Sequence, residues 1–224
     1  MVGVCFDMDG VLVDSEDHWV EREREDLFAW LVPDDRVPVG EITGMHYGEI
    51  YEYLAEHYAV DADWETYDAW FQETAREIYL EEVELLPGTH ALFDELHRRD
   101  ATIAIVSSSP RDWIALVVDR FDLTGDLEAV VSAEDVDGPG KPAPGIYEHA
   151  ADVLGEDPSD CVAVEDSEHG IAAAVEAGMA CVAYDIDAHD DFDLSGADVV
   201  ARDPEGLAEA VIELVEARGG RVDP

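Results

Sequence analysis

Six short apolar runs alternate with longer amphipathic stretches along this chain, and this alternation restricts the fold more than any other feature. Short β-rich runs are typical of buried strands, and amphipathic stretches between them are typical of covering helices. Together they predict an α/β fold built on a parallel sheet. The expected strands are Val2–Phe6, Ala101–Val106, Ala129–Val131, Cys161–Val164, Cys181–Tyr184 and Val199–Ala201. The expected helices between them are Thr89–Arg99, Arg111–Arg120, Pro144–Leu154, Glu168–Ala177 and Pro204–Arg218.

One long interval interrupts this rhythm after the first expected strand. The next strand begins more than 90 residues later, whereas a crossover connection needs only about a dozen residues. Within the interval the pattern predicts helices at Asp17–Leu31, Gly48–Tyr58 and Trp64–Glu82. We therefore expect residues 15–86 to form an inserted α-helical cap domain, and residues 1–14 and 87–224 to form the core. The alternative is that these helices simply extend the main core.

The charge of the chain is strongly acidic, with 56 Asp and Glu against 12 Lys and Arg and a net charge of −44. Nucleic acids and anionic membranes are bound by clustered cations, so both classes of partner are excluded. Because 47% of the residues are hydrophobic, the chain can still bury a core. Self-repulsion weakens as the Debye length falls from ~10 Å at 0.1 M salt to ~3 Å at 1 M. The composition therefore indicates adaptation to the salt-rich cytoplasm of a halophile.

Other compositional features favour a reduced, cytoplasmic protein. No apolar stretch of about 18 residues and no signal peptide is present. Cys5, Cys161 and Cys181 each fall in an expected strand, and their odd number without paired spacing favours core residues over disulfides or zinc. Eleven of the 12 cations are Arg and only Lys141 is a lysine. A single retained lysine suggests a chemical task, although a leftover surface lysine would have the same appearance.

Acidic residues follow two of the expected strands. Asp7 and Asp9, with Gly10, end the first strand, at the sheet edge where open α/β sheets bind ligands. Glu165 and Asp166 follow the fourth strand in the same way. If these strands are neighbours, Asp7, Glu165 and Asp166 converge as oxygen ligands suited to Mg²⁺. Taken alone, the first pair is also compatible with a turn or a calcium loop.

Two further segments suggest a phosphate site. Ser107, Ser108 and Ser109 precede the helix expected at Arg111, where hydroxyls and backbone amides can cradle phosphate. An ordinary serine N-cap is the alternative. Lys141 is followed by Pro142 in a stiff segment, and a fixed ammonium suits a point contact to phosphate.

These segments carry a family resemblance. Phe6 to Ser15, the serine loop at Ser107, Lys141-Pro142, and Glu165-Asp166-Ser167 with Gly170 resemble the four motifs of the haloacid dehalogenase superfamily, in their usual order. The chain is most similar to the subgroup that contains β-phosphoglucomutase, phosphoglycolate phosphatase and sugar-phosphate phosphatases. The resemblance implies a Rossmann-like core with a helical cap inserted after the first motif.

The resemblance also implies a mechanism. Asp7 would attack phosphorus and form an aspartyl-phosphate, and Asp9 would serve as general acid and then as general base. Mg²⁺ would be held by the Asp7 carboxylate, the Asp9 backbone carbonyl, Asp166 and Glu165. Ser107 and Lys141 would bind the transferring phosphoryl group. The remaining expected substrate contacts are Ser108, Arg111 and the cap residue His46.

The expected activity is therefore Mg²⁺-dependent hydrolysis of a small phosphorylated metabolite, either a sugar phosphate or phosphoglycolate. A phosphosugar mutase is the first alternative, although Trp19 stands where that subgroup commonly carries histidine, and Tyr47 near where β-phosphoglucomutase carries arginine. A phosphonatase is excluded because the expected cap contains no lysine. A catalytically silent binding module is the remaining alternative. The motifs leave the oligomeric state open between monomer and dimer.

Overall fold

The fold was analysed in a computed structural model, which describes residues 1–22, 27–32, 37, 45, 47–185 and 193–219. A parallel sheet of six strands forms its centre, in the order β3-β2-β1-β4-β5-β6. The strands confirm the predicted α/β fold, with ends that differ from expectation by one residue at most. Their bounds are β1 Val2–Phe6, β2 Ala101–Ser107, β3 Ala129–Ser132, β4 Cys161–Glu165, β5 Ala180–Tyr184 and β6 Val199–Ala201.

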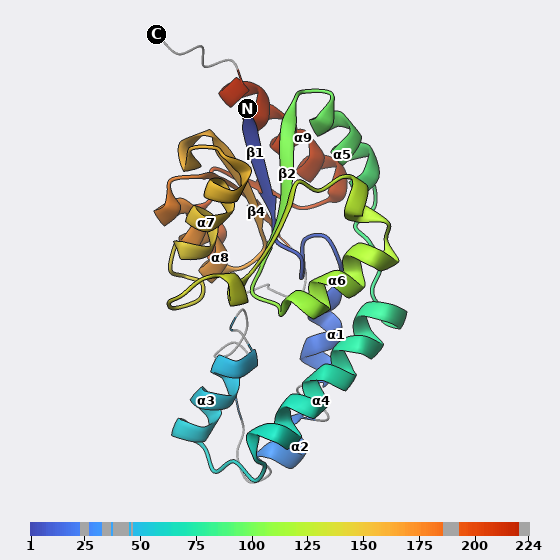
Figure 1. The fold of residues 1–224 in the computed structure, drawn as a ribbon, viewed down its shortest axis with the longest axis vertical. Helices are drawn as coiled ribbons and strands as arrows, with labels where there is room; N and C mark the ends of the chain where they lie inside the picture. Colours follow the sequence, from blue (N-terminus) through green and yellow to red (C-terminus); the bar gives the residue numbers. More distant parts are fainter. Residues whose placement is uncertain (23–26, 33–36, 38–44, 46, 186–192, 220–224) are drawn as a thin grey trace.

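Helices cover both faces of this sheet, because its strands are apolar on both sides. One face packs against α7 (Gly145–Leu154) and α8 (Glu168–Ala177). The other packs against α5 (Thr89–His97), α6 (Arg111–Arg120) and α9 (Pro204–Gly219), as Figure 1 shows. The three cysteines are buried on the α7–α8 face, as predicted for core residues. None of the helices that the structure describes is long and apolar enough to span a bilayer.

Between β1 and β2 the chain forms a helical insertion, which we define as residues 15–86. Its described elements lie together at one end of the molecule (Figure 1). They are α1 Ser15–Arg22, α2 Phe28–Leu31, α3 Tyr47–His57, α4 Trp64–Glu77 and η3 Ile78–Glu82. The chain segments that enter and leave the insertion pair with each other, since the Leu86 amide donates to the Leu12 carbonyl at 2.8 Å and Val13 bridges to Leu85.

The helices of the insertion differ from expectation at two places. The helix expected at Asp17–Leu31 is described as α1 and α2, with residues 23–26 outside the described part. The helix expected at Trp64–Glu82 is α-helical only to Glu77 and then widens into a π-helical turn, where the Val83 amide donates to the Ile78 carbonyl. Such turns re-aim side chains and are frequent at functional sites. A single apolar cluster continues from the insertion into the core, so the division into two domains stays a prediction.

Candidate active site

The acidic residues predicted to converge do so at the carboxyl edge of the sheet. In the parallel register Phe6 lies opposite both Ile105 and Val164, so β1, β2 and β4 end together. Carboxylate oxygens of Asp7, Glu165 and Asp166 consequently lie within 4.8 Å of one another. All three residues are buried. The strand order thus gathers acids that are more than 150 positions apart in the sequence.

Lys141 reaches into this acidic cluster from the segment before α7. Its Nζ donates to Asp7 Oδ1 at 2.5 Å, to Glu165 Oε1 at 2.6 Å and to the Val106 carbonyl at 3.3 Å. The Lys141 side chain is only 4% exposed. The hydroxyl of Tyr147 also donates to Glu165. The lone lysine is therefore a buried part of the site rather than a surface residue.

Burial dominates the electrostatics of the cluster. Burial raises the pKa of Asp7 well above its usual range; Lys141 acts in the opposite direction, and neighbouring Glu165 adds to the rise. Burial, followed by the charges of Glu16 and Asp7, raises the pKa of Asp166 in the same way. Burial opposes the charge on Lys141, but Asp7 and Glu165 raise its pKa above the ordinary value. Three buried carboxylates thus face one ammonium, which favours a further cation between them.

Two glycines allow the carboxylates to approach the backbone. A Cβ at Gly10 would lie 1.9 Å from Asp166 Oδ2, and Gly10 also has a positive φ of 74°. A Cβ at Gly170 would lie 1.9 Å from Glu165 Oε2. A side chain at either position would therefore force the neighbouring carboxylate to move, and at Gly10 it would also meet an unfavourable backbone conformation. The glycines next to the acidic motifs are thus part of how those acids are placed.

Asp9 behaves differently from its neighbour Asp7. Its carboxylate accepts hydrogen bonds from three hydroxyls: Ser15 Oγ and Tyr79 Oη at 2.6 Å to Oδ1, and Ser109 Oγ at 2.7 Å to Oδ2. Burial raises the pKa of Asp9, while these hydroxyls lower it. The Asp9 side chain is thus held by hydroxyls and is not one of the three carboxylates that form the acidic cluster.

Sequence reasoning did not identify Tyr79 as a site residue. Tyr79 is 70 residues from Asp9, inside a segment that reads as an ordinary acidic helix. Its phenol is fully buried, and burial followed by the charge of Asp9 raises its pKa well above the usual value. No local pattern marks this contact, because only the packing of the insertion on the core creates it.

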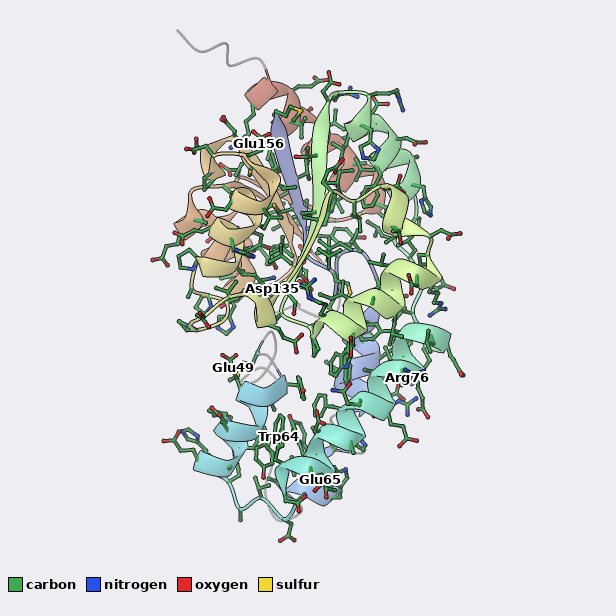
Figure 2. All side chains as sticks on the ribbon, viewed as in Figure 1. Glu49, Trp64, Glu65, Arg76, Asp135 and Glu156 are labelled. Carbon is green, nitrogen blue, oxygen red and sulfur yellow. The ribbon has the colours of Figure 1, made fainter. Side chains whose placement is uncertain are left out.

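The residues predicted to bind phosphate and substrate have mixed outcomes. Ser107 is buried, and its Oγ accepts the backbone N–H of Ser109 at 3.0 Å. Ser108, Lys141 and Glu49 of α3 are among the residues that line a cavity of about 170 Å³. Figure 2 shows Glu49 at the end of α3 that faces the core. The serine loop, the Lys141 segment and α3 thus border one open space, and the lining of that space does not include Asp7 or Asp9.

The two remaining expected substrate contacts, Arg111 and His46, receive no support from the structure. The Arg111 guanidinium pairs with Asp135 and is half exposed, so the expected substrate contact stays a prediction without a supporting contact. His46 lies outside the described residues. Tyr47 beside it donates its hydroxyl to Asp68 at 3.0 Å and packs among aromatic rings of the insertion.

Known proteins with this architecture are numerous. A curated relative is a probable pseudouridine-5'-phosphatase of Drosophila melanogaster, 31% identical over 183 residues, which cover 79% of this chain and 78% of the relative. Hexitol phosphatase B of Escherichia coli K12 is 31% identical, covering 80% of this chain and 81% of its own. Validoxylamine A 7'-phosphate phosphatase of Streptomyces hygroscopicus subsp. limoneus is 30% identical, and the match covers 88% of this chain and 92% of the relative.

Solved structures agree on the fold. A putative β-phosphoglucomutase from Thermotoga maritima superposes with a TM-score of 0.70 at 26% identity, covering 95% of this chain and 99% of that one. CbbY from Rhodobacter sphaeroides, solved in complex with phosphate, superposes with a TM-score of 0.76 at 23% identity. The match covers 92% of this chain and 99% of the CbbY chain.

The family profile decides the classification. The profile of haloacid dehalogenase-like hydrolases matches residues 1–178, which contain all four segments of the site. Together with the curated phosphatases, this match confirms the predicted class of enzyme. The chain therefore belongs to the haloacid dehalogenase-like hydrolase family and is a phosphoric monoester hydrolase.

Proposed function

We propose that this enzyme is a Mg²⁺-dependent phosphatase that hydrolyses a small phosphorylated metabolite through an aspartyl-phosphate intermediate. One observation carries the proposal: Asp7 is buried and bonded to Lys141, and Asp9, two residues later, is held separately by hydroxyls. Two neighbouring carboxylates in different surroundings suit two different roles in one reaction.

The roles follow from these surroundings. An Asp7 oxygen attacks phosphorus, the new O–P bond forms as the ester O–P bond breaks, and Asp9 gives its proton to the leaving oxygen. Water then attacks phosphorus, Asp9 accepts a proton from that water, and the Asp7–phosphorus bond breaks to release inorganic phosphate. Lys141 and the serine loop bind the phosphoryl oxygens, whose charge the ammonium offsets.

The residues at the sheet edge fit a magnesium ion. Asp7, Glu165 and Asp166 supply the carboxylate oxygens that Mg²⁺ prefers. The glycines at positions 10 and 170 leave room for two of these carboxylates. We propose that Asp7, Asp166, Glu165 and the Asp9 carbonyl hold the ion, as the family resemblance implies. When bound, the ion offsets the negative charge of the carboxylates and of the substrate phosphate.

The substrate class is supported by the named relatives. Those relatives are phosphatases of pseudouridine 5'-phosphate, hexitol phosphates and validoxylamine A 7'-phosphate, all phosphate esters of polyhydroxylated compounds. We therefore favour a sugar or polyol phosphate over phosphoglycolate. Trp19 directs its indole N–H to Tyr79 where the mutase subgroup commonly carries histidine, which supports hydrolysis rather than phosphoryl transfer between sugars.

We further propose that residues 15–86 act as a cap over the phosphate site. The cavity beside Lys141 is lined from both sides, by Glu49 of the insertion and by Ser108 and Glu134 of the core. Oxygens of the Glu49 carboxylate lie 3.5 Å from a Cβ built at Gly140. A leaving group bound there would contact both parts, so the insertion would set substrate preference.

The test is a comparison of three proteins. Wild type, Asp7→Asn and Asp94→Asn, a control on the exposed surface of α5, are assayed with p-nitrophenyl phosphate and with hexitol phosphates, with and without Mg²⁺. We expect Mg²⁺-dependent phosphate release by wild type and control, and none by Asp7→Asn with an unchanged circular dichroism spectrum. Full activity of Asp7→Asn would contradict the mechanism. Conversion of glucose 1-phosphate to glucose 6-phosphate would show a mutase instead.

A further inference from the structure

Tyr79 occupies an unusual place between the insertion and the proposed acid–base group. It lies in the π-helical turn after α4, is fully buried, and donates its hydroxyl proton to Asp9 Oδ1 at 2.6 Å. The same hydroxyl accepts the indole N–H of Trp19 at 3.0 Å. Since a phenol has one proton to donate, the Trp19 contact leaves that proton directed at Asp9.

Packing fixes both rings of this pair. The Trp19 indole packs against two rings, Phe71 of α4 at 5.5 Å and 20° and Trp113 of α6 at 5.3 Å and 19°, and these two rings also contact each other at 6.3 Å. The Tyr79 ring contacts the Trp19 and Trp113 rings at 6.1 Å. The Tyr79 carbonyl accepts a hydrogen bond from Arg120 of α6 at 2.8 Å. The phenol is therefore held by both the insertion and the core.

The other two hydrogen-bond donors to Asp9 are serines, whose side chains are shorter than that of tyrosine. Ser15 is six residues from Asp9 at the start of α1, and Ser109 belongs to the loop after β2. Ser15 is buried, and both residues carry small hydroxyls on short side chains. Tyr79 differs because its hydroxyl sits at the end of a rigid ring that other aromatic rings hold, which suits it to define the orientation of the carboxylate.

We propose that Tyr79, held by Trp19, is a positioning residue that orients the Asp9 carboxyl group for proton transfer to the leaving oxygen. The inference rests on the proposed phosphatase mechanism and deepens it. In the first step the Asp9 O–H bond breaks and a bond from that proton to the leaving oxygen forms. Tyr79 keeps its own proton throughout and acts only by holding Oδ1.

The experiment uses the dependence on the leaving group. The leaving oxygen of an alkyl phosphate such as glycerol 2-phosphate must be protonated as it departs. The leaving group of 2,4-dinitrophenyl phosphate is a weakly basic phenolate, which departs without protonation. The quantity kcat/KM reports the first phosphoryl transfer for both substrates. We expect Tyr79→Phe to lower kcat/KM for the alkyl ester about tenfold, the scale of one lost orienting hydrogen bond, and that for the aryl ester less than about twofold.

Tyr51→Phe is the matched control, because it removes a hydroxyl of the insertion that donates to the Ala62 carbonyl at 3.0 Å rather than to a residue of the site. We expect this variant to leave kcat/KM for both substrates unchanged. Trp19→Phe should produce a smaller loss with the same leaving-group pattern. The double variant should equal Tyr79→Phe alone, because Trp19 acts through Tyr79.

Equal losses on the two substrates, or no loss on the alkyl ester, would overturn the inference and assign Tyr79 a purely structural role. If Tyr79→Phe does not fold, the leaving-group pattern of Trp19→Phe decides between the same two results. Failure of the proposed function is a separate outcome, since wild type itself would then release no phosphate from either ester.

Discussion

Replacing Lys141 by methionine would test how the buried acids are stabilised. Methionine keeps the length and apolar stem of the side chain and removes the ammonium. That ammonium lies 2.5 Å from Asp7 Oδ1 and 2.6 Å from Glu165 Oε1. At an effective dielectric constant of about 20, each contact is worth about 6 kcal/mol before desolvation is counted.

Desolvation of the buried ammonium offsets most of this attraction. Removing one partner of a buried ion pair nevertheless leaves uncompensated charge, and such changes typically destabilise by about 3–5 kcal/mol. We expect Lys141→Met to lower the free energy of unfolding by that amount at neutral pH. The matched control is Arg202→Met, which removes an exposed cation paired with Asp185 and should change stability by less than about 1 kcal/mol.

The loss should also depend on pH, and its sign follows from the raised pKa of Asp7 and Asp166. A carboxyl group whose pKa is higher in the folded state takes up its proton before the unfolded chain does. Its stabilising effect is therefore complete at low pH and is lost as pH rises through the folded pKa. The variant should gain stability relative to wild type as pH falls through the raised pKa of these carboxyl groups, because protonated carboxyls no longer need the ammonium.

Urea unfolding followed by tryptophan fluorescence, at fixed KCl and at several pH values, measures this difference. Urea is used because it is uncharged and leaves ionic strength constant. The reasoning would be refuted by a Lys141→Met variant within about 1 kcal/mol of wild type at neutral pH, or by a loss that does not change with pH.

Three further predictions concern the acids, the glycines and the surface charge. Mg²⁺ at about 100 times its Kd should stabilise the wild-type protein by about 2.7 kcal/mol, measured as a rise in Tm in a thermal-shift assay. Asp166→Asn should abolish most of this rise in Tm, and an equal rise in both proteins would exclude Asp166 as a ligand. Gly170→Ala should destabilise by about 1–3 kcal/mol, because its Cβ would lie 1.9 Å from Glu165, whereas Gly125→Ala has no atom within 4 Å and should be neutral by urea unfolding. Raising KCl from about 0.1 to 2 M should raise Tm in calorimetry, because it screens the net charge of −44; a constant or falling Tm would contradict salt adaptation.

The sequence alone determined the sheet and the acids at its edge. Apolar runs such as Val2–Phe6 and Cys161–Val164 are recognisable because a strand buried on both faces must be continuously apolar. The change from apolar to acidic residues at Asp7 marks where that strand leaves the core. Parallel strands end at a common edge, so the meeting of Asp7 with Glu165 and Asp166 was expected on the condition that their strands are neighbours, which the β1–β4 pairing confirms.

Only the tertiary structure decided where the remaining side chains of the site point. The pairing of Arg111 with Asp135 depends on how the α6 and β3 ends meet. The bond from Tyr79 to Asp9 requires a π-helical turn and a packed aromatic stack from α1, α4 and α6. Local periodicity shows which residues are buried, but the direction of a buried side chain is set by distant elements packed against it. Hence the sequence predicts the acid Asp9, whereas the residue that orients it is evident only in the folded molecule.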